Sequence, residues 1–267
     1  MHRDQKVWIR GAGELASATA YSLHQAGFRI VMSELAEPLA IRRKVSFSDA
    51  IHTGQTAVEG VIAVKGAVAD VPDILERGHI ALVIDAPDLQ RTLNPDIMID
   101  ARMLKRTVES VRSNAPFRVG LGPGFHAGRE CDAVIETQRG HDLSRIIWEG
   151  TAKPSTGIPG MIAGETVRRV LYAPVAGTVN WSVDFGDLVE ADDILGRIGS
   201  AHELQAPLSG LVRGLISPLS PVTAGLKIAD IDPRGREVDH QTISDKARSV
   251  GRGALEAVLI FLNKPGH

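Results

Sequence analysis

The sequence has few of the features that mark secreted, membrane-spanning or nucleic-acid-binding proteins. Cys131 is the one cysteine in 267 residues, which excludes an intrachain disulfide and is typical of a reducing compartment. The 30 Lys and Arg nearly balance the 32 Asp and Glu, so no net field attracts nucleic acid or an anionic membrane. The longest apolar run, near residues 254–262, is well short of the roughly 18 residues that a spanning helix needs. We expect a protein that binds neither nucleic acid nor membrane.

The opening of the chain and its composition are those of an ordinary globular protein. Residues 1–6 lead into an apolar segment without the features of a signal peptide, so the cytoplasm is the expected location. Apolar residues make up 43% and charged residues 23% of the chain, which argues against disorder or a coiled coil.

The first part of the chain alternates β-rich and helical segments. Residues 7–10 and 29–32 read as strands, and residues 14–26 between them as an amphipathic helix that ends at Gly27. Later strand candidates are residues 61–64, 81–84, 97–99, 118–121, 133–136 and 145–148. This pattern predicts a Rossmann-like α/β domain over residues 1–165, with a mostly parallel sheet.

Residues 166–233 contain short strand patterns, frequent turn residues and an internal repeat. The segment APVAGTV at 173–179 returns as APLSGLV at 206–212, and Val189 and Val222 keep the same offset. Two such β-halves are too small to bury separate cores, so we expect them to interlock in one small all-β domain. Residues 234–267 are predicted to contain a helix at 244–262 that packs on the α/β domain; a partner-binding helix is the alternative.

The turn after the first strand has a nucleotide-binding pattern. Gly11, Gly13 and Ala16 form a G-x-G-x-x-A motif between strand and helix, and Glu34 follows at the end of the second strand, where an acid can hold ribose hydroxyls. Glu14 opposes this reading, because a carboxylate in the first helical turn repels a phosphate there. A purely structural turn is the alternative.

Charged residues follow other predicted strands. Asp85 and Asp100 lie where strands end, and either could bind a metal ion or ligand hydroxyls, or cap the next segment. Arg42 and Arg43 could hold a phosphate, or lie on a solvated face.

A glycine-rich loop at residues 120–128 supplies the other predicted ligand contacts. Gly122, Gly124 and Phe125 belong to it, and its backbone N–H groups could form an anion-binding nest. Arg139 and His141 follow the next strand and could bring a cation and an imidazole to the same edge. His141 and Cys131 are the catalytic candidates, with a structural histidine and an inert thiol as alternatives. The sequence leaves open whether any reaction is catalysed, and no metal site is predicted.

Several segments together resemble a known family. They are residues 9–16, 40–43, 122–125, 136–141 and 156–160. They resemble the YqeB-type accessory proteins of selenium-dependent molybdenum hydroxylase systems, which are similar in their Rossmann part to accessory factors of the XdhC/CoxI type. The resemblance implies a role in maturing a molybdenum hydroxylase of the xanthine dehydrogenase class.

The all-β segment resembles a biotinyl/lipoyl domain, also called a barrel-sandwich hybrid. Carriers of that type present a modified lysine at the hairpin joining the two halves, whereas residues 199–203 hold none and Lys227 lies elsewhere. The resemblance therefore implies a docking or structural module, without biotin or lipoate.

The leading hypothesis is thus an accessory protein for a molybdenum hydroxylase client. Its α/β domain would bind the molybdenum cofactor or a nucleotide, either NAD(P) or a cytidine or adenine nucleotide. The alternatives are an NAD(P)-binding oxidoreductase and a non-enzymatic scaffold that forms a homo-oligomer through the sandwich.

Overall fold

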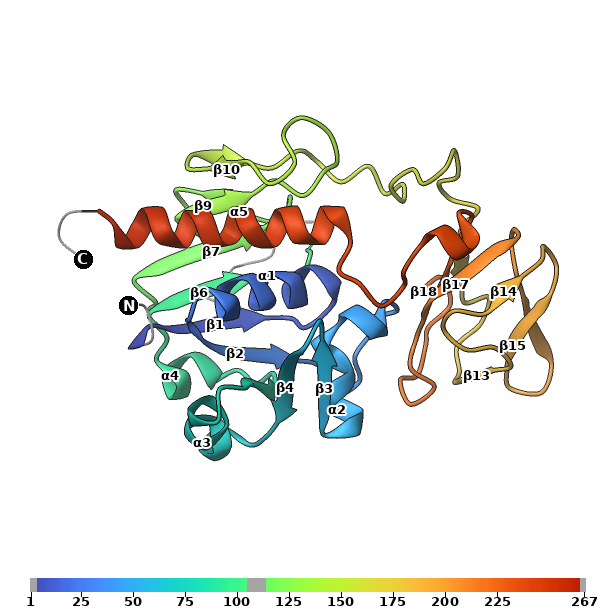
Figure 1. Ribbon diagram of the computed structural model, residues 1–267, viewed down its shortest axis with the longest axis horizontal. Helices are drawn as coiled ribbons and strands as arrows, with labels where there is room; N and C mark the ends of the chain where they lie inside the picture. Colours follow the sequence, from blue (N-terminus) through green and yellow to red (C-terminus); the bar gives the residue numbers. More distant parts are fainter. Residues whose placement is uncertain (1–3, 105–113, 265–267) are drawn as a thin grey trace. The chain divides into compact units, whose positions relative to one another are not determined.

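A computed structural model describes residues 4–104 and 114–264 of the chain (Figure 1). The chain divides into two compact units, which are described separately. The first comprises Met1–Ala36, Ser46–Thr156 and Ile243–His267, and the second comprises Glu37–Val45 and Gly157–Thr242.

The first unit is built on a nine-stranded mixed sheet, with the strand order β10-β9-β7-β6-β1-β2-β5-β4-β3. The strands from β9 to β4 in that order pair in parallel, whereas the edge strands β3 and β10 are antiparallel to their neighbours. The strands are β1 (Lys6–Arg10), β2 (Arg29–Glu34), β3 (Gln55–Val58), β4 (Val61–Lys65), β5 (Ile80–Ile84), β6 (Ile97–Asp100), β7 (Phe117–Leu121), β9 (Ala133–Ile135) and β10 (Ile146–Ile147). A separate two-stranded sheet pairs β8 (His126–Ala127) with β11 (Gly150–Thr151).

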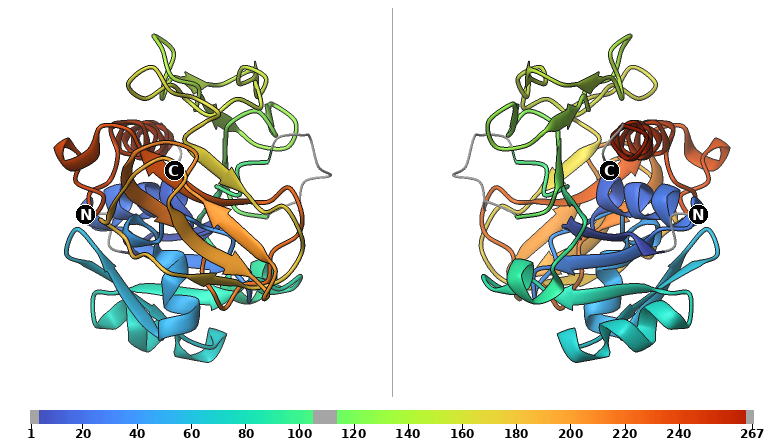
Figure 2. Two further views of the ribbon diagram at one scale, coloured as in Figure 1. Left: turned by 90° about the vertical axis from the view of Figure 1, so that its right-hand side faces the viewer. Right: turned by 90° about the vertical axis from the view of Figure 1, so that its left-hand side faces the viewer.

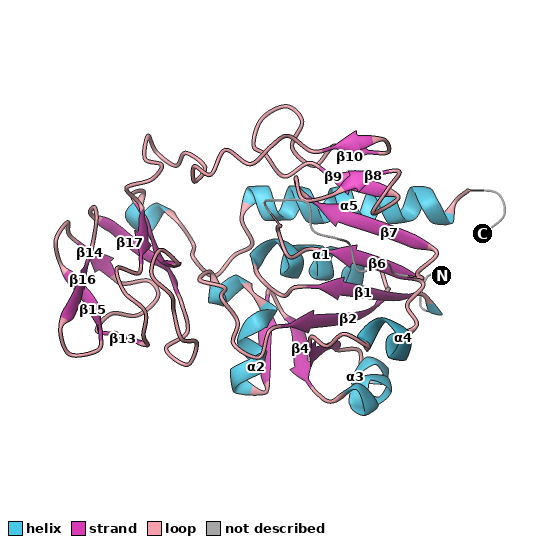
Figure 3. Ribbon diagram, turned by 180° about the vertical axis from the view of Figure 1, so that it is seen from behind, coloured by secondary structure: helices cyan, strands magenta, loops and turns pink. Residues whose placement is uncertain are grey.

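Helices cover both faces of this sheet, because its central strands are apolar on both sides. The helices are α1 (Glu14–Gln25), α2 (Ala50–Thr53), α3 (Val71–Glu76), α4 (Leu89–Leu93) and α5 (Asp245–Leu262), with 3-10 turns at Phe47–Asp49 and Val68–Asp70. Residues of α3 and α4 share a core with Trp8, Val31 and Met98. In Figure 3, α1 and α5 lie behind the sheet.

Helix α5 packs closely on α1 because it carries glycine at the contact. A Cβ atom on Gly251 would lie 2.5 Å from the carbonyl oxygen of Ala18, closer than real Cβ contacts allow. The two helices begin at the same edge of the sheet, where the parallel strands end; this carboxyl edge is the usual ligand-binding edge of a parallel sheet (Figure 1).

The second unit consists of two antiparallel sheets, whose strands are mainly orange in Figure 2. One has the order β12-β18-β17-β14 and the other β13-β15-β16. The strands are β12 (Val170–Tyr172), β13 (Val179–Trp181), β14 (Leu188–Val189), β15 (Ile194–Ile198), β16 (His202–Gln205), β17 (Gly210–Leu215) and β18 (Lys227–Asp232), and the unit also holds 3-10 turns at Arg43–Val45 and Gly235–Glu237.

The two copies of the repeat pair reciprocally. Gly177 of the first copy bridges Val222 of the second, and Gly210 of the second pairs with Val189 of the first. The same exchange occurs at the alanines: Ala173 N–H donates to the Leu226 carbonyl at 2.8 Å, and Ala206 N–H donates to the Asp193 carbonyl at 2.8 Å. Because both pairs of contacts keep the offset of the repeat, the two halves are intertwined about a pseudo-twofold axis.

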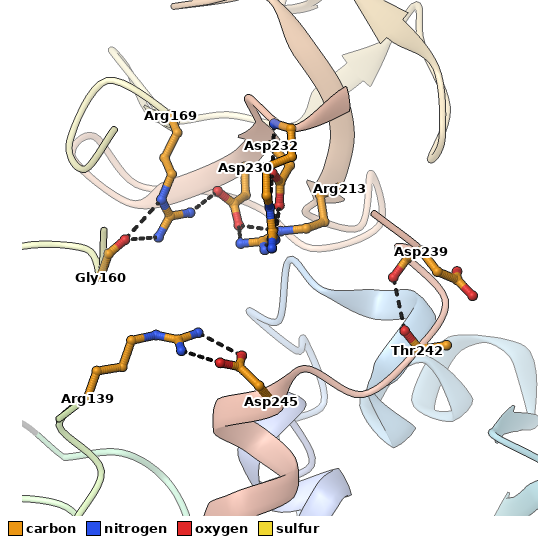
Figure 4. A network of polar contacts seen from close by, with 10 residues as sticks. Arg139, Gly160, Arg169, Arg213, Asp230, Asp232, Asp239, Thr242 and Asp245 are labelled. Atoms are coloured by element: carbon orange, nitrogen blue, oxygen red, sulfur yellow. Dashed lines mark hydrogen bonds and ion pairs between the residues drawn. The ribbon is translucent and has the colours of Figure 1, made fainter. Parts of the chain in front are cut away.

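A ladder of alternating arginines and aspartates, buried except for Arg234, lies in the second unit (Figure 4). Arg169 bonds one oxygen of Asp230, Arg213 bridges Asp230 and Asp232, and Arg234 holds Asp232 with bonds of 3.0 and 2.8 Å. Arg169 also donates to the Gly160 carbonyl at 3.0 Å. Among the described residues, no buried nitrogen or oxygen of these side chains lacks a hydrogen bond.

The predicted fold class was wrong. In place of a Rossmann-like, mostly parallel domain joined to a biotinyl/lipoyl-like barrel-sandwich, the structure has one large mixed α/β sheet and separate small antiparallel sheets. The sequence signal failed at the edges of the large sheet, because residues 55–58 of β3 showed no strand pattern and the strand expected at 145–148, which contains β10, gave no direction. Within the described residues, no helix is long and apolar enough to cross a membrane.

Candidate functional site

The turn between β1 and α1 depends on Gly11. This residue has a φ of +96°, and its N–H donates to the Ser33 carbonyl at 2.7 Å. A Cβ atom here would also lie 3.2 Å from the Ala101 carbonyl oxygen. Gly11 is therefore required by the backbone itself, whether or not a ligand binds.

Gly13 has a different environment. It is the N-cap residue of α1, with φ −70° and ψ −177°, values that other residues adopt freely. A Cβ atom on Gly13 would meet no atom within 4 Å. As the N-cap residue, Gly13 has no side chain to accept a hydrogen bond from the first turn of the helix. Ala16, by contrast, is buried in the core.

Glu34 closes the turn from the end of β2. Its Oε2 accepts the Ala12 N–H at 2.7 Å, and its Oε1 accepts the Leu35 N–H at 2.7 Å. Burial raises the pKa of Glu34 above its usual value, although the Leu35 and Ala12 hydrogen bonds act against this shift. Each carboxylate oxygen can accept a second hydrogen bond, so Glu34 retains capacity for ligand hydroxyls.

An apolar side chain lies next to this carboxylate. Ile84 is the parallel partner of Glu34 across β2 and β5, and it is 45% exposed. Paired residues of a parallel ladder project to the same face, so the two side chains share one surface. Leu35 is also exposed, at 51%. Ile84 was not predicted as a site residue, because an isoleucine at the end of an apolar strand is typical of the buried core.

Four charged residues form a cluster where β1, β5 and β6 end: Arg10, Asp85, Asp100 and Arg102. Arg10 Nη2 donates to Asp85 Oδ2 at 2.8 Å, and its Nη1 lies 4.0 Å from Asp100 Oδ2. Arg102 donates to both carboxylate oxygens of Asp100, from Nε to Oδ1 at 2.9 Å and from Nη2 to Oδ2 at 2.6 Å. Burial opposes the charge of Arg102, but its hydrogen bond and ion pair with Asp100 raise its pKa.

The charged cluster is incompletely bonded. Arg10 is only 7% exposed, and its guanidinium lies 5.6 Å from the Trp8 ring centroid. Within the described residues, Arg10 Nε and Nη1 and Asp85 Oδ1 have no hydrogen-bond partner. Sequence reasoning predicted Asp85 and Asp100 but missed both arginines. The available signal was Arg10 itself, a charged residue at the end of the apolar segment 7–10.

Arg139 and Lys246 lie near the start of α5. Arg139 forms two hydrogen bonds with Asp245, at 2.5 and 2.9 Å (Figure 4). Lys246 is half-buried, and burial together with the charge of Arg139 lowers its pKa, against the opposing effects of Glu14 and Glu136. Lys246 thus offsets part of the negative charge of Glu14 at the N-terminus of α1.

The glycine-rich loop after β7 is packed against protein atoms. A Cβ atom on Gly124 would lie 2.6 Å from the Leu104 carbonyl oxygen, and one on Gly122, where φ is +85°, would lie 3.0 Å from Thr137 Oγ1. Phe125 is buried in a core cluster with Cys131. Local packing is therefore sufficient to explain glycine at both positions.

The remaining predicted residues lie in other parts of the chain. Arg42 and Arg43 belong to the second unit, where Arg43 lies 5.5 Å from the Phe185 ring centroid. His141 is exposed. Cys131 is buried, and burial raises the pKa of its thiol to about 12, so the thiol is protonated near neutral pH. Across residues 4–104 and 114–264, no three His, Cys, Asp or Glu side chains are grouped to hold a metal ion.

Comparisons with known proteins give one close relative in sequence. The chain is 44% identical over 262 residues to the "Uncharacterized protein YqeB" of Escherichia coli strain K12. The match covers 97% of the chain but 48% of the relative, so the chain spans about half the length of the curated protein it matches. No family model matches the chain.

Similarity to solved structures is weak. A succinylglutamate desuccinylase/aspartoacylase from Rhodobacter sphaeroides is 13% identical, with 85% of each chain covered and a TM-score of 0.28. The ectoine utilization protein EutE (DoeB) from Ruegeria pomeroyi is 12% identical over 85% of this chain and 84% of that one, with a TM-score of 0.26. Scores this low support no inference about the activity of this chain.

The role drawn from the family resemblance has to be corrected. The sequence relative has a name that assigns no function, so it supports neither an accessory role nor a client enzyme. Nothing found supports the maturation of a molybdenum hydroxylase, so that prediction was wrong. The short glycine motifs were poor evidence for the family's function, because glycine at such turns is also required by the backbone or by packing, as at Gly11 and Gly124.

Proposed function

We propose that the first unit binds a ribonucleotide at the carboxyl edge of its sheet, on the turn between β1 and α1. Glu34 carries the proposal. Its carboxylate is fixed by two backbone N–H groups, and each oxygen can still accept a hydroxyl of the ribose diol. An acid at the end of the second strand is the residue that holds ribose in dinucleotide-binding folds.

The surroundings of Glu34 suit the other parts of a nucleotide. Ile84 and Leu35 offer exposed apolar surface on which a base can lie. The space beside Gly13 admits a phosphate to the uncapped first turn of α1. Lys246 reduces the repulsion from Glu14, so a phosphate there is not opposed by an unbalanced carboxylate.

The test is a thermal-shift and calorimetric titration of the chain with AMP, CMP, GMP, UMP and NAD. A ligand at 100 times its dissociation constant stabilises the folded state by about 2.7 kcal/mol, which gives a clear shift in Tm. The 2′,3′-dideoxy form of each binding nucleotide should bind at least about tenfold more weakly, since one tenfold step corresponds to about 1.4 kcal/mol, a typical hydrogen bond to a charged group.

Two variants and a matched control localise the binding. Glu34→Gln and Gly13→Val should abolish the shift, the first by removing the charged acceptor and the second by filling the open space. Asp96→Asn is the control, because Asp96 also accepts a backbone N–H, from Lys6 at 2.7 Å, but at the start of β6. No shift with any of the five probes, or equal binding of ribose and dideoxyribose forms, would show the proposal to be wrong.

We also infer a cytoplasmic location. The single cysteine supports it, since a chain without disulfides gains nothing from an oxidising compartment. Fractionation of cells that express the native chain tests this, and recovery in a membrane or exported fraction would contradict it.

A further inference from the structure

The charged cluster of Arg10, Asp85, Asp100 and Arg102 offers hydrogen-bonding capacity that the described protein atoms do not use. Arg10 Nε and Nη1 are donors, and Asp85 Oδ1 is an acceptor, and each lacks a partner among the described residues. Buried polar atoms nearly always find partners, so three such atoms in one ion pair point to a group from outside the chain. The complete bonding of Asp100 by Arg102 shows that the unused capacity is confined to the Arg10–Asp85 pair.

The charges of the cluster decide what kind of group fits. Two arginines and two aspartates already balance, and both carboxylates lie close to Arg10, at 2.8 and 4.0 Å. A ligand phosphate or carboxylate would gain Arg10 but meet repulsion from Asp85 and Asp100. A neutral group with an acceptor for Arg10 beside a donor for Asp85 satisfies Asp85 Oδ1 and one of the two Arg10 nitrogens without added charge.

The cluster adjoins the proposed ribose site. The Asp85 N–H donates to the Glu34 carbonyl at 2.8 Å, and Asp85 follows Ile84, the strand partner of Glu34. The Asp85 side chain is 24% exposed and that of Arg102 29%, whereas that of Arg10 is 8% exposed. Asp85 and Arg102 are therefore the more exposed members of the cluster, and Arg10 is more buried than either.

We propose that the Arg10–Asp85 pair reads the polar edge of a neutral, amino-bearing heterocycle, with Arg10 donating to a ring nitrogen and Asp85 accepting from the adjacent amino group. This inference rests on the proposed nucleotide binding and specifies the class of base. AMP and CMP carry such an edge, with an amino group beside an unprotonated ring nitrogen.

The experiment compares probes that differ by one amino group. AMP is titrated against purine ribonucleoside 5′-monophosphate, and CMP against its analogue without the 4-amino group. At least one amino-bearing probe should bind the wild-type chain about tenfold more tightly than its analogue, since a buried acceptor left without its donor costs about one tenfold step in affinity. Asp85→Asn retains a carbonyl oxygen for Arg10 but can replace the unused acceptor by a donor, so this preference should disappear.

A control and the contrary outcomes make the test decisive. Asp88→Asn should leave the preference unchanged. Asp88 lies three residues after Asp85, and its ion pair with Arg91 is exposed. Equal binding within both probe pairs, or a preference that survives in Asp85→Asn, overturns the inference while ribose-dependent binding stands. Binding of only UMP in the wider panel also overturns it, because uracil carries no amino group. Failure of the whole panel removes the proposed function as well.

Discussion

Two buried networks of arginine and aspartate differ in how completely they are bonded. In the ladder of the second unit, Arg213 lies between Asp230 and Asp232, and the polar atoms of these buried side chains have partners. In the charged cluster of the first unit, Arg10 makes one hydrogen bond and leaves Nε and Nη1 without partners in the described chain. Burying charge is tolerated only with compensation, so the ladder is self-sufficient, whereas the cluster leaves hydrogen-bonding capacity that we propose a ligand uses.

Their places in the fold agree with this difference. The ladder runs along the inner strands β17 and β18, where backbone pairing also surrounds the side chains. The charged cluster lies where parallel strands end, which is the usual ligand edge of such a sheet. The first network therefore serves folding, and the second is suited to binding.

Removal of the central ladder arginine should have the largest effect. Arg213→Met leaves two buried carboxylates with fewer partners and should lower the free energy of unfolding by about 3–5 kcal/mol. Urea denaturation monitored by circular dichroism measures this. Arg197→Met is the control, since its pair with Glu203 is half-exposed and should contribute less than about 1 kcal/mol. A ladder variant no less stable than the control would contradict the comparison.

The second-largest effect is expected from acid, which should lower the stability that the ladder contributes. Burial alone would raise the pKa of Asp230 and Asp232, but Arg213 and neighbouring cations outweigh it and lower both. Because the folded pKa lies below the unfolded value, this stability is present above about pH 4 and is lost as the pH falls through the folded pKa. Each unit of lowering contributes about 1.4 kcal/mol.

The pH dependence can be assigned with one variant. Asp232→Asn should be less stable than the wild type at about pH 6, and the difference should shrink as the medium becomes more acidic. Unfolding by urea at several pH values measures both curves. A difference that does not change with pH would show that the ion pairs of Asp232 do not account for the acid sensitivity.

Arg10 should matter less to stability than Arg213. Arg10→Met loses one hydrogen bond to a charged group but also removes two unsatisfied donors, so we expect a net cost below about 2 kcal/mol. The same variant should weaken AMP or CMP binding, if either binds, by at least about tenfold. Parallel urea and calorimetric titrations separate the two effects. A stability loss equal to that of Arg213→Met would mean that both networks serve folding.

The parts of the structure that were predictable depend on local sequence. The segments expected at 7–10, 14–26 and 29–32 coincide with β1, α1 and β2, because hydrophobic period and the glycine after the helix are local signals. The hairpin of β3 and β4 was only half predicted, although Glu59 and Gly60, both with positive φ, form its turn. Because the edge strands β3 and β10 are antiparallel to their neighbours, the sheet is mixed and not mostly parallel as predicted.

The candidate site was predictable only in part for the same reason. Gly11, Gly13 and Glu34 were found, because the turn and the following strand end are close in sequence. The bond between Arg10 and Asp85 joins residues 75 positions apart, and it depends on which strands become neighbours in the sheet. Arg42 and Arg43 were assigned to the site from sequence proximity, but their segment folds with the second unit.

The smallest change in the free energy of unfolding is expected for alanine at Gly13, which the fold does not need to be glycine, in contrast to Gly210. Gly210 and Gly13 form the pair, because a Cβ atom on Gly210 would lie 2.4 Å from the Asp232 carbonyl oxygen, whereas one on Gly13 meets nothing within 4 Å. Gly210→Ala should cost about 1–3 kcal/mol through overpacking beside the ladder. Gly13→Ala should cost less than about 1 kcal/mol, the modest loss expected for alanine at an N-cap. Urea denaturation of both variants measures the contrast. If Gly13→Ala keeps its stability but binds the ribonucleotide more weakly, glycine at that position serves the ligand, and equal losses of stability would assign it to the fold.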